Sequence, residues 1–356
     1  MIKGKGMYIW KVKECENGVI SDIVNKAIMA ELSHVIIKIA DGKVGYNFTA
    51  ADGDLAKQLT IDLQAHGIEV WGYQYIYGSD PIGEAVKAAT RIDQTGVTGF
   101  VINAEKEVRD MHGNGAYVDA YCRRFREAQP SMILALSSYR YPDLHRQLPW
   151  STFAKYIDLW MPQVYWMQAH NPTAQLRETL KQYADLETDL PVIPTGSAFC
   201  EWGWCASRDE ITEFMNEAQA QELSAVNFWE WSNTVKNNLW QPIHSFLWEL
   251  DEEPTEPEPP PTDCCDELRE DMITYIDTQL KKQNDLIRTD MLFVINKLRD
   301  ETRELIELLE LPETNYSIEI DQKINDFYQL NLRGTLYNLK LKAHSHPQWM
   351  SRFFKK

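Results

Sequence analysis

Residues 70–107, VWGYQYIYGSDPIGEAVKAATRIDQTGVTGFVINAEKE, predict one complete strand–helix–strand unit. Apolar and aromatic residues dominate 70–75 and 100–103, which is typical of buried strands, and a helical pattern occupies 81–94 between them. Pro81 suits the first turn of that helix. Because a helical crossover joins parallel strands, this stretch predicts a parallel α/β sheet.

The same alternation of strand and helix extends in both directions from this unit. Asp54 and Ser207 are placed to cap helix N-termini, and Gly67 and Gly96 are placed to end helices. Eight strands are expected, at 7–10, 35–40, 70–75, 100–103, 133–137, 159–163, 192–194 and 226–229. Helices are expected near 20–30, 54–66, 81–94, 116–129, 150–156, 173–185, 207–221 and 240–250.

Eight strand–helix units within about 250 residues have the size of a single closed barrel. An open, doubly wound sheet is the alternative. Such a sheet would place a glycine-rich phosphate-binding turn after its first strand, but Trp10 is followed by KVKECENG. The sequence therefore predicts an α/β (β/α)8 TIM barrel over residues 1–250.

Three further segments are predicted after the barrel. Residues 251–263, DEEPTEPEPPPTD, indicate an acidic proline-rich linker that acts as a semi-rigid spacer. Over 264–311 the apolar positions follow a hendecad pattern, which predicts a long coiled-coil helix that self-associates as a dimer or trimer; folding back on the barrel is the alternative. Vicinal Cys264 and Cys265 either link chains or stay free. Residues 312–356, a short β-hairpin pattern with a basic end, are interpreted as a docking segment for a larger protein assembly or as a solvated terminus.

Composition excludes several classes of partner. The formal charge of −17 repels nucleic-acid phosphates and anionic lipid, so neither is expected to bind. No apolar run reaches the length of a membrane span, and the N-terminal MIKGKGMYIWKV lacks the apolar core of a signal peptide. We expect synthesis in the cytoplasm, with any incorporation into a virion or extracellular particle by another route.

The six cysteines show no metal-site spacing, so no metal is expected. Cys200 and Cys205 flank EWGW. They either bridge a loop or, as a cytoplasmic chain favours, remain free thiols.

The ends of the predicted strands hold the candidate site, because barrels of this kind bind substrate there. These ends combine aromatic rings with amide, hydroxyl and charged groups. Sugar rings stack on aromatic faces while their hydroxyl groups need directional hydrogen-bond partners, so the pattern predicts a glycan or polysaccharide as ligand and no cofactor. The predicted substrate-binding residues are Tyr8, Trp10, Lys38, Asp41, Tyr73, Tyr75, Tyr139, Gln163, Tyr165 and Trp229.

One carboxylate among these strand ends is a candidate general acid. Glu105 follows the apolar strand GFVINAE, and a carboxyl group framed by aromatic side chains is suited to that role. Glycoside hydrolysis usually needs a second carboxylate, for which Glu230 and Asp41 are the candidates. The alternative for each is a surface charge or a hydrogen-bonded loop anchor.

Five stretches together resemble the lysozyme-like glycoside hydrolase barrels of family 25: VIIKIADG, VWGYQYIYG, GFVINAEKE, LPWSTFAKYIDLWMPQVYW and AVNFWEWS. The resemblance covers residues 5–250. In that family the fourth strand ends in Asp-x-Glu, with the glutamate as the acid and the aspartate assisting it. The resemblance therefore assigns the acid to Glu105 and places an amide, Asn103, in the assisting position. The family's first-strand aspartate is also missing from MYIWK.

Three functions are compatible with these observations. The first is an active glycoside hydrolase that cleaves cell-wall or surface polysaccharide, with Glu105 as acid and Asn103, Gln163 and Tyr165 positioning the sugar. The second is a glycan-binding head with weak or no hydrolase activity, displayed on an oligomeric stalk. The third is an architectural component. The second and third combined, in a phage-like virion or surface appendage, are favoured because an amide cannot supply the negative charge that stabilises an oxocarbenium-like transition state.

Overall fold

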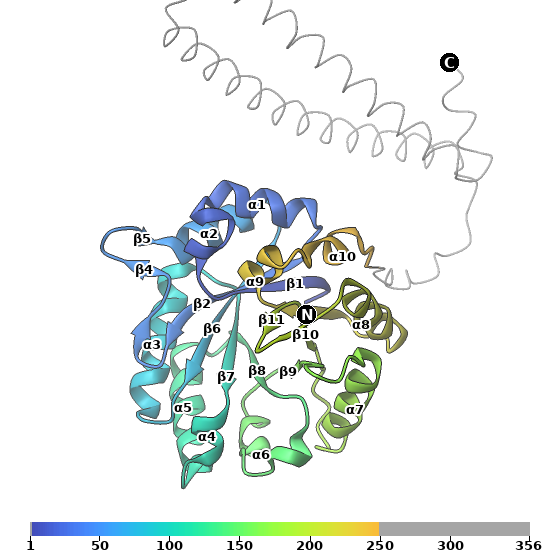
Figure 1. The fold of residues 1–356 in the computed structure, drawn as a ribbon. Coiled ribbons are helices and arrows are strands. Elements are labelled where there is room, and N and C mark those ends of the chain that lie inside the picture. Colours follow the sequence, from blue (N-terminus) through green and yellow to red (C-terminus); the bar gives the residue numbers. More distant parts are fainter. Residues whose placement is uncertain (1, 249–356) are drawn as a thin grey trace, which may run out of the picture. The chain divides into compact units, whose positions relative to one another are not determined.

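A computed structural model describes residues 2–248 of the chain (Figure 1). The predicted linker at 251–263, the coiled-coil helix at 264–311 and the C-terminal segment at 312–356 lie outside the described residues.

Eight parallel strands form a closed barrel in the order β1-β13-β10-β9-β8-β7-β6-β2, and pairing of β1 with β2 closes it. The helices surround the strands, as Figure 1 shows. This confirms the predicted TIM barrel and excludes the open sheet. The strands are β1 Gly4–Ile9, β2 His34–Asp41, β6 Glu69–Ile76, β7 Gly99–Ala104, β8 Ile133–Tyr139, β9 Leu159–Val164, β10 Thr195–Ser197 and β13 Ala225–Trp229.

The expected helices are present, and most end close to the predicted bounds; those expected at 150–156 and 240–250 end earlier, at Phe153 and Ser245. The helices are α1 Ile20–Met29, α2 Leu55–Ala65, α3 Pro81–Thr95, α5 Asn114–Ala128, α6 Trp150–Phe153, α7 Pro172–Ala184, α8 Arg208–Ala220 and α10 Trp240–Ser245. Asp54 accepts a hydrogen bond from the Lys57 N–H at 3.1 Å, and Ser207 forms a capping box with Glu210. Gly96 ends α3 in the left-handed region, at a φ of 76°.

Several short elements lie in the connections between the strands and were not predicted. They are the helices α4 Lys106–Asp110 and α9 Trp231–Lys236, the 3-10 helices Val12–Glu14, Glu16–Gly18 and Pro142–His145, and the short strands β3 Val44–Gly45, β4 Phe48–Thr49, β5 Gly53–Asp54, β11 Cys200–Glu201 and β12 Trp204–Cys205.

The seventh strand begins later than predicted. The sequence suggests 192–194, but the ladder of β10 starts at Thr195, and Val192 makes only an isolated bridge to Trp160. Pro191 and Pro194 lack the N–H group that a strand interior donates, so regular pairing starts only after Pro194.

Strand alternation separates two cores. One set of alternate residues packs against the helices, and the other set fills the barrel interior, where Tyr8, Trp71, Tyr73 and Met161 are buried. Side chains in a strand point to one face at every second position. The next inward positions after Val101, Ala135 and Met161 therefore face the C-terminal opening of the barrel, which we call the mouth.

A histidine is buried in the interior at the start of β2. His34 Nε2 hydrogen-bonds Asn227 Oδ1 at 2.5 Å, and His34 Nδ1 hydrogen-bonds Ser33 Oγ at 2.8 Å. The ring occupies the space that a Cβ atom at Gly6 would need, so only glycine fits there.

Candidate glycan-binding site

A single amide joins three neighbouring strands at the mouth. Gln163 Nε2, on β9, donates to Glu105 Oε1 at 2.8 Å and to Asn103 Oδ1 at 3.2 Å, both from the β7 end. It also lies 3.4 Å from Ser137 Oγ on β8. Since Asn103, Ser137 and Gln163 all stand at inward positions, strand alternation brings them together. Asn103 is buried and Glu105 is partly exposed.

Three phenols lie close enough to Glu105 for its charge to affect their pKa. Burial is the largest cause that raises the pKa of Tyr75, Tyr139 and Tyr165, and the negative charge of Glu105 raises each further. Tyr75 also donates a hydrogen bond to Glu107. All three phenols stay protonated at neutral pH, and the hydroxyl groups of Tyr139 and Tyr165 can donate to a ligand oxygen.

The floor of the mouth is an aromatic cluster of Tyr8, Tyr73 and Trp229. Their ring centroids are 5.4 Å (Tyr8–Tyr73), 5.6 Å (Tyr8–Trp229) and 6.1 Å (Tyr73–Trp229) apart. Trp229 is partly exposed, whereas the two phenols are buried. Within residues 2–248 the buried hydroxyl groups of Tyr73 and Thr195 have no hydrogen-bond partner. A surface of this kind combines an apolar platform with unsatisfied polar groups.

The rim over β1 and β2 carries a cation between aromatic rings. Lys38 Nζ lies 3.1 Å from Asp41 Oδ1, 4.4 Å from the ring centroid of Tyr46 and 6.0 Å from that of Trp10. Burial lowers the pKa of Lys38, while Asp41 opposes that shift. Tyr77 donates from its hydroxyl to Asp41 at 3.1 Å. Trp10, Lys38 and Asp41 therefore lie together, as expected of neighbouring strand ends.

Glu230 is placed differently from the other candidates. It follows Trp229, the last residue of β13, and stands at the N-terminus of α9. Its carboxylate accepts from the N–H groups of Ser232 at 3.2 Å and Asn233 at 2.8 Å and from the Ser232 hydroxyl at 2.6 Å, so it caps α9. These bonds engage both oxygens, as expected of a hydrogen-bonded loop anchor.

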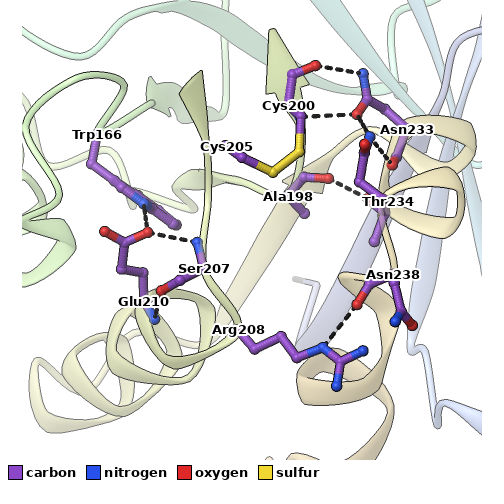
Figure 2. Close-up of a disulfide and its surroundings, with 11 residues drawn as sticks. Trp166, Ala198, Cys200, Cys205, Ser207, Arg208, Glu210, Asn233, Thr234 and Asn238 are labelled. Carbon is purple, nitrogen blue, oxygen red and sulfur yellow. Dashed lines mark hydrogen bonds between the residues drawn. A yellow bond between two sulfur atoms is a disulfide. The ribbon is translucent and has the colours of Figure 1, made fainter. Parts of the chain in front are cut away.

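A hairpin of β11 and β12 follows β10 at the mouth. Cys200 and Cys205 pair across it and are joined by a disulfide, which corrects the expectation of free thiols (Figure 2). The hairpin is fastened to α9, because the Cys200 N–H donates to Asn233 Oδ1 at 2.9 Å and Thr234 Oγ1 donates to the Ala198 carbonyl at 2.7 Å.

On its other side the hairpin leads into the capped start of α8. Glu210 accepts from Trp166 Nε1 at 3.3 Å and from the Ser207 N–H at 2.7 Å (Figure 2). The loops after β9, β10 and β13 thus form one connected rim.

The prediction from strand ends missed several residues of the rim. Tyr46 and Trp202 lie well past the ends of β2 and β10, Tyr77 directly follows β6 but lies beyond the predicted strand 70–75, and Glu107 lies on the unpredicted α4. A search for aromatic residues a few positions beyond each strand would have found the first three.

Two surface hollows of about 440 and 420 Å³ lie away from the mouth. The first lies between α7 and α8, where Thr173 already bonds Glu213 at 2.7 Å. The second adjoins α6 and is lined in part by Trp150 and Trp160. Neither includes a strand-end residue of the predicted site, so the convergence of eight strands places the candidate site at the mouth.

In the part of the chain that the structure describes, no three His, Cys, Asp or Glu side chains gather in a way that could ligate a metal. No helix within residues 2–248 is long and apolar enough to cross a membrane.

Comparison with known proteins identifies relatives of the fold only. No family model and no curated protein matches the chain. Similar solved structures include a class V chitinase from Nicotiana tobaccum (10% identity, TM-score 0.52), a family GH18 chitinase from Cycas revoluta in complex with allosamidin (10%, 0.50) and a GH18 chitinase from Pseudoalteromonas aurantia (14%, 0.50). The match covers 68%, 67% and 67% of this chain and 98% of each chitinase.

These structures correct the resemblance drawn from sequence. The expected family was glycoside hydrolase family 25, but the similar barrels belong to family 18. At 10–14% identity the likeness establishes the fold alone. Residues 2–248 therefore form a TIM barrel of the architecture that glycoside hydrolases use.

Proposed function

We propose that the barrel binds a glycan containing N-acetylglucosamine at its mouth, with weak or no hydrolysis. The observation that carries this proposal is the Gln163 amide, which bonds Glu105 and Asn103 between the phenols of Tyr75, Tyr139 and Tyr165. Amide and phenol groups around a carboxylate, above the indole of Trp229, match the alternating apolar faces and hydroxyl groups of a sugar. The similar chitinase structures support the sugar type, since a mutant class V chitinase from Nicotiana tobaccum was crystallised with NAG4.

The carboxylates of the mouth favour binding over efficient cleavage. A two-carboxylate mechanism needs a nucleophile or base opposite Glu105, and the Glu230 carboxylate is already engaged as the cap of α9. Asp41 is paired with Lys38. At position 103 an amide can orient an acetamido group by hydrogen bonding but adds no negative charge.

Hydrolysis with Glu105 as general acid is the second candidate. In substrate-assisted glycosidases the acetamido group of the sugar replaces the nucleophile, so one protein acid is sufficient. Glu105 is partly exposed at the mouth, so a ligand can reach its carboxylate. The hydrogen bond from Gln163 then fixes the orientation of the acid.

The C-terminal part of the chain extends this proposal to the presentation of several barrels together. The sequence pattern predicts a spacer at 251–263 and a self-associating helix at 264–311, and 312–356 is interpreted as a docking segment. We propose that several barrels are presented together on a particle or appendage, where multivalency raises the apparent affinity. Analytical ultracentrifugation of the full chain and of a chain ending at residue 250 tests this part, and a monomeric full chain contradicts it.

A binding measurement with the full chain tests the central proposal. Isothermal titration with N-acetylglucosamine oligomers should give saturable binding, which Trp229→Ala weakens roughly tenfold by removing the platform. Trp229→Phe is the matched control, because it keeps an aromatic face over Tyr8 and Tyr73 and should lose less. Absence of binding by the wild-type chain rejects the proposal.

A further inference from the structure

One tryptophan stands apart from the site described above. Trp202, in the turn between β11 and β12, is 82% exposed, the highest value among the large hydrophobic side chains of the described residues. Trp204, two positions later, is buried, and its ring lies 5.6 Å from that of Phe199. The hairpin thus uses Trp204 to hold itself in place and directs Trp202 into solvent.

The backbone at Trp202 is unfavourable for a tryptophan. Trp202 and Gly203 both lie in the left-handed region, with φ of 48° and 78°. Two-residue hairpin turns of this kind favour Asn-Gly, and a bulky residue at the first position is rare. The exposed indole gains no packing that would offset the strain, so stability does not explain why tryptophan stands here.

The segment that leads into the hairpin contacts two residues of the candidate site. The Ala198 N–H donates to the Trp229 carbonyl at 3.0 Å, and the Phe199 ring meets the Tyr165 ring edge-on at 5.3 Å. Tyr165 lies close enough to Glu105 for that carboxylate to raise its pKa. Trp202 is therefore linked to the mouth through Phe199 and Trp204.

Three tryptophans follow adjacent strands. Trp10, Trp229 and Trp202 lie at or beyond the ends of β1, β13 and β10, which are neighbours in the barrel. Trp10 is 40% exposed and Trp229 is partly exposed. The disulfide and the two hydrogen bonds between Cys200 and Asn233 fix the hairpin, so the indole is presented with little ordering cost on binding.

We propose that Trp202 is the platform of an outer subsite, on which one sugar unit of an extended glycan stacks while another unit occupies the mouth. This inference rests on the proposed function. It adds that the ligand is an oligosaccharide or polysaccharide chain longer than the part held by Gln163, Glu105 and Trp229.

Binding of a short and a long oligomer by the full chain tests the subsite. We expect the wild-type chain to bind the N-acetylglucosamine hexamer more tightly than the dimer. Trp202→Asn should lower hexamer affinity roughly three- to tenfold and leave dimer affinity unchanged. This variant creates Asn-Gly at the turn, so the hairpin should form at least as well as in the wild type.

Met29→Ala serves as the matched control. Met29 is 67% exposed at the end of α1, which leads to the start of β2 at the opposite end of the barrel. The Met29→Ala variant should change neither the dimer affinity nor the hexamer affinity. Equal affinity of the wild type for dimer and hexamer, or wild-type hexamer binding by Trp202→Asn, overturns the subsite while the proposed function stands. A wild-type chain that binds neither oligomer overturns both.

Discussion

The side-chain amide of Gln163 donates to Glu105 Oε1 at 2.8 Å, which ties the candidate acid to a strand two places away in the barrel. The same nitrogen donates to Asn103 Oδ1 at 3.2 Å. Gln163 therefore contacts both residues on which the choice between the two proposed functions, glycan binding and hydrolysis, depends.

Asn103→Asp should raise the hydrolytic rate. The introduced carboxylate can accept the bond that Gln163 now donates to Asn103, and it adds a negative charge that stabilises a developing oxocarbenium ion. We expect turnover of N-acetylglucosamine oligomers to rise at least about tenfold above the wild-type level. Release of reducing ends measures it. Asn103→Ala is the control, and an Asn103→Asp variant as slow as the control would exclude charge at position 103 as the missing element.

Glu105→Gln should separate catalysis from binding. The neutral amide keeps an oxygen that can accept from Gln163, but it cannot donate a proton to a leaving group. Any turnover should fall to the background, and the Kd for the tetramer should stay within about threefold of the wild-type value. Titration calorimetry beside the reducing-end assay checks both values. Equal turnover in the two chains would show that the chemistry lies elsewhere.

His34 should make the barrel less stable in acid. Burial lowers the pKa of His34 to about 4 in the folded state, although its bond with Asn227 opposes the shift. The unfolded chain has a histidine pKa of about 6.5, so between these values it takes up a proton that the folded state rejects. Stability is full above about pH 6.5 and falls by about 3 kcal/mol as the pH drops to about 4.

Urea unfolding at pH 7 and pH 4 measures that change. His34→Gln is the control, since a neutral amide can still bond Asn227 and does not titrate. The variant should be less stable at pH 7 and should lose less stability on acidification. A pH dependence identical to that of the wild type contradicts the assignment.

Cleavage of the disulfide should affect long ligands selectively. A Cys200→Ser, Cys205→Ser double variant removes the crosslink but keeps Asn233, so the hairpin should loosen while the barrel stays folded. Hexamer affinity should fall by a factor of about two to five, less than for Trp202→Asn, and dimer affinity should not change. Fluorescence titration in oxidising buffer provides the comparison. A larger loss for the dimer would place the hairpin inside the mouth instead of beyond it.

The local pattern of the sequence was sufficient to predict the barrel. Strand 70–75, helix 81–94 and strand 100–103 lie within a few residues of β6, α3 and β7, because hydrophobic periodicity and the Pro81 and Gly96 signals act over short distances. The error at 192–194 has the same origin, since pattern alone does not count the amide hydrogens that Pro191 and Pro194 lack.

Strand alternation also allowed most of the candidate site to be anticipated. Once eight strands close, positions such as 103, 137 and 163 must face the same opening. The sequence therefore placed Asn103, Gln163 and Tyr165 together without any knowledge of their contacts. It could not show that Gln163 would bond Glu105, because that depends on the spacing of segments far apart in the chain.

Only the tertiary structure decided the roles of Glu230, Cys200 and Cys205. A carboxylate after the eighth strand has the same local sequence whether or not it caps the next helix, and its hydrogen bonds follow from where Ser232 and Asn233 lie. Two cysteines five positions apart pair only if a turn reverses the chain between them. Local sequence determines which residues share a face, whereas packing between distant segments determines which of them touch.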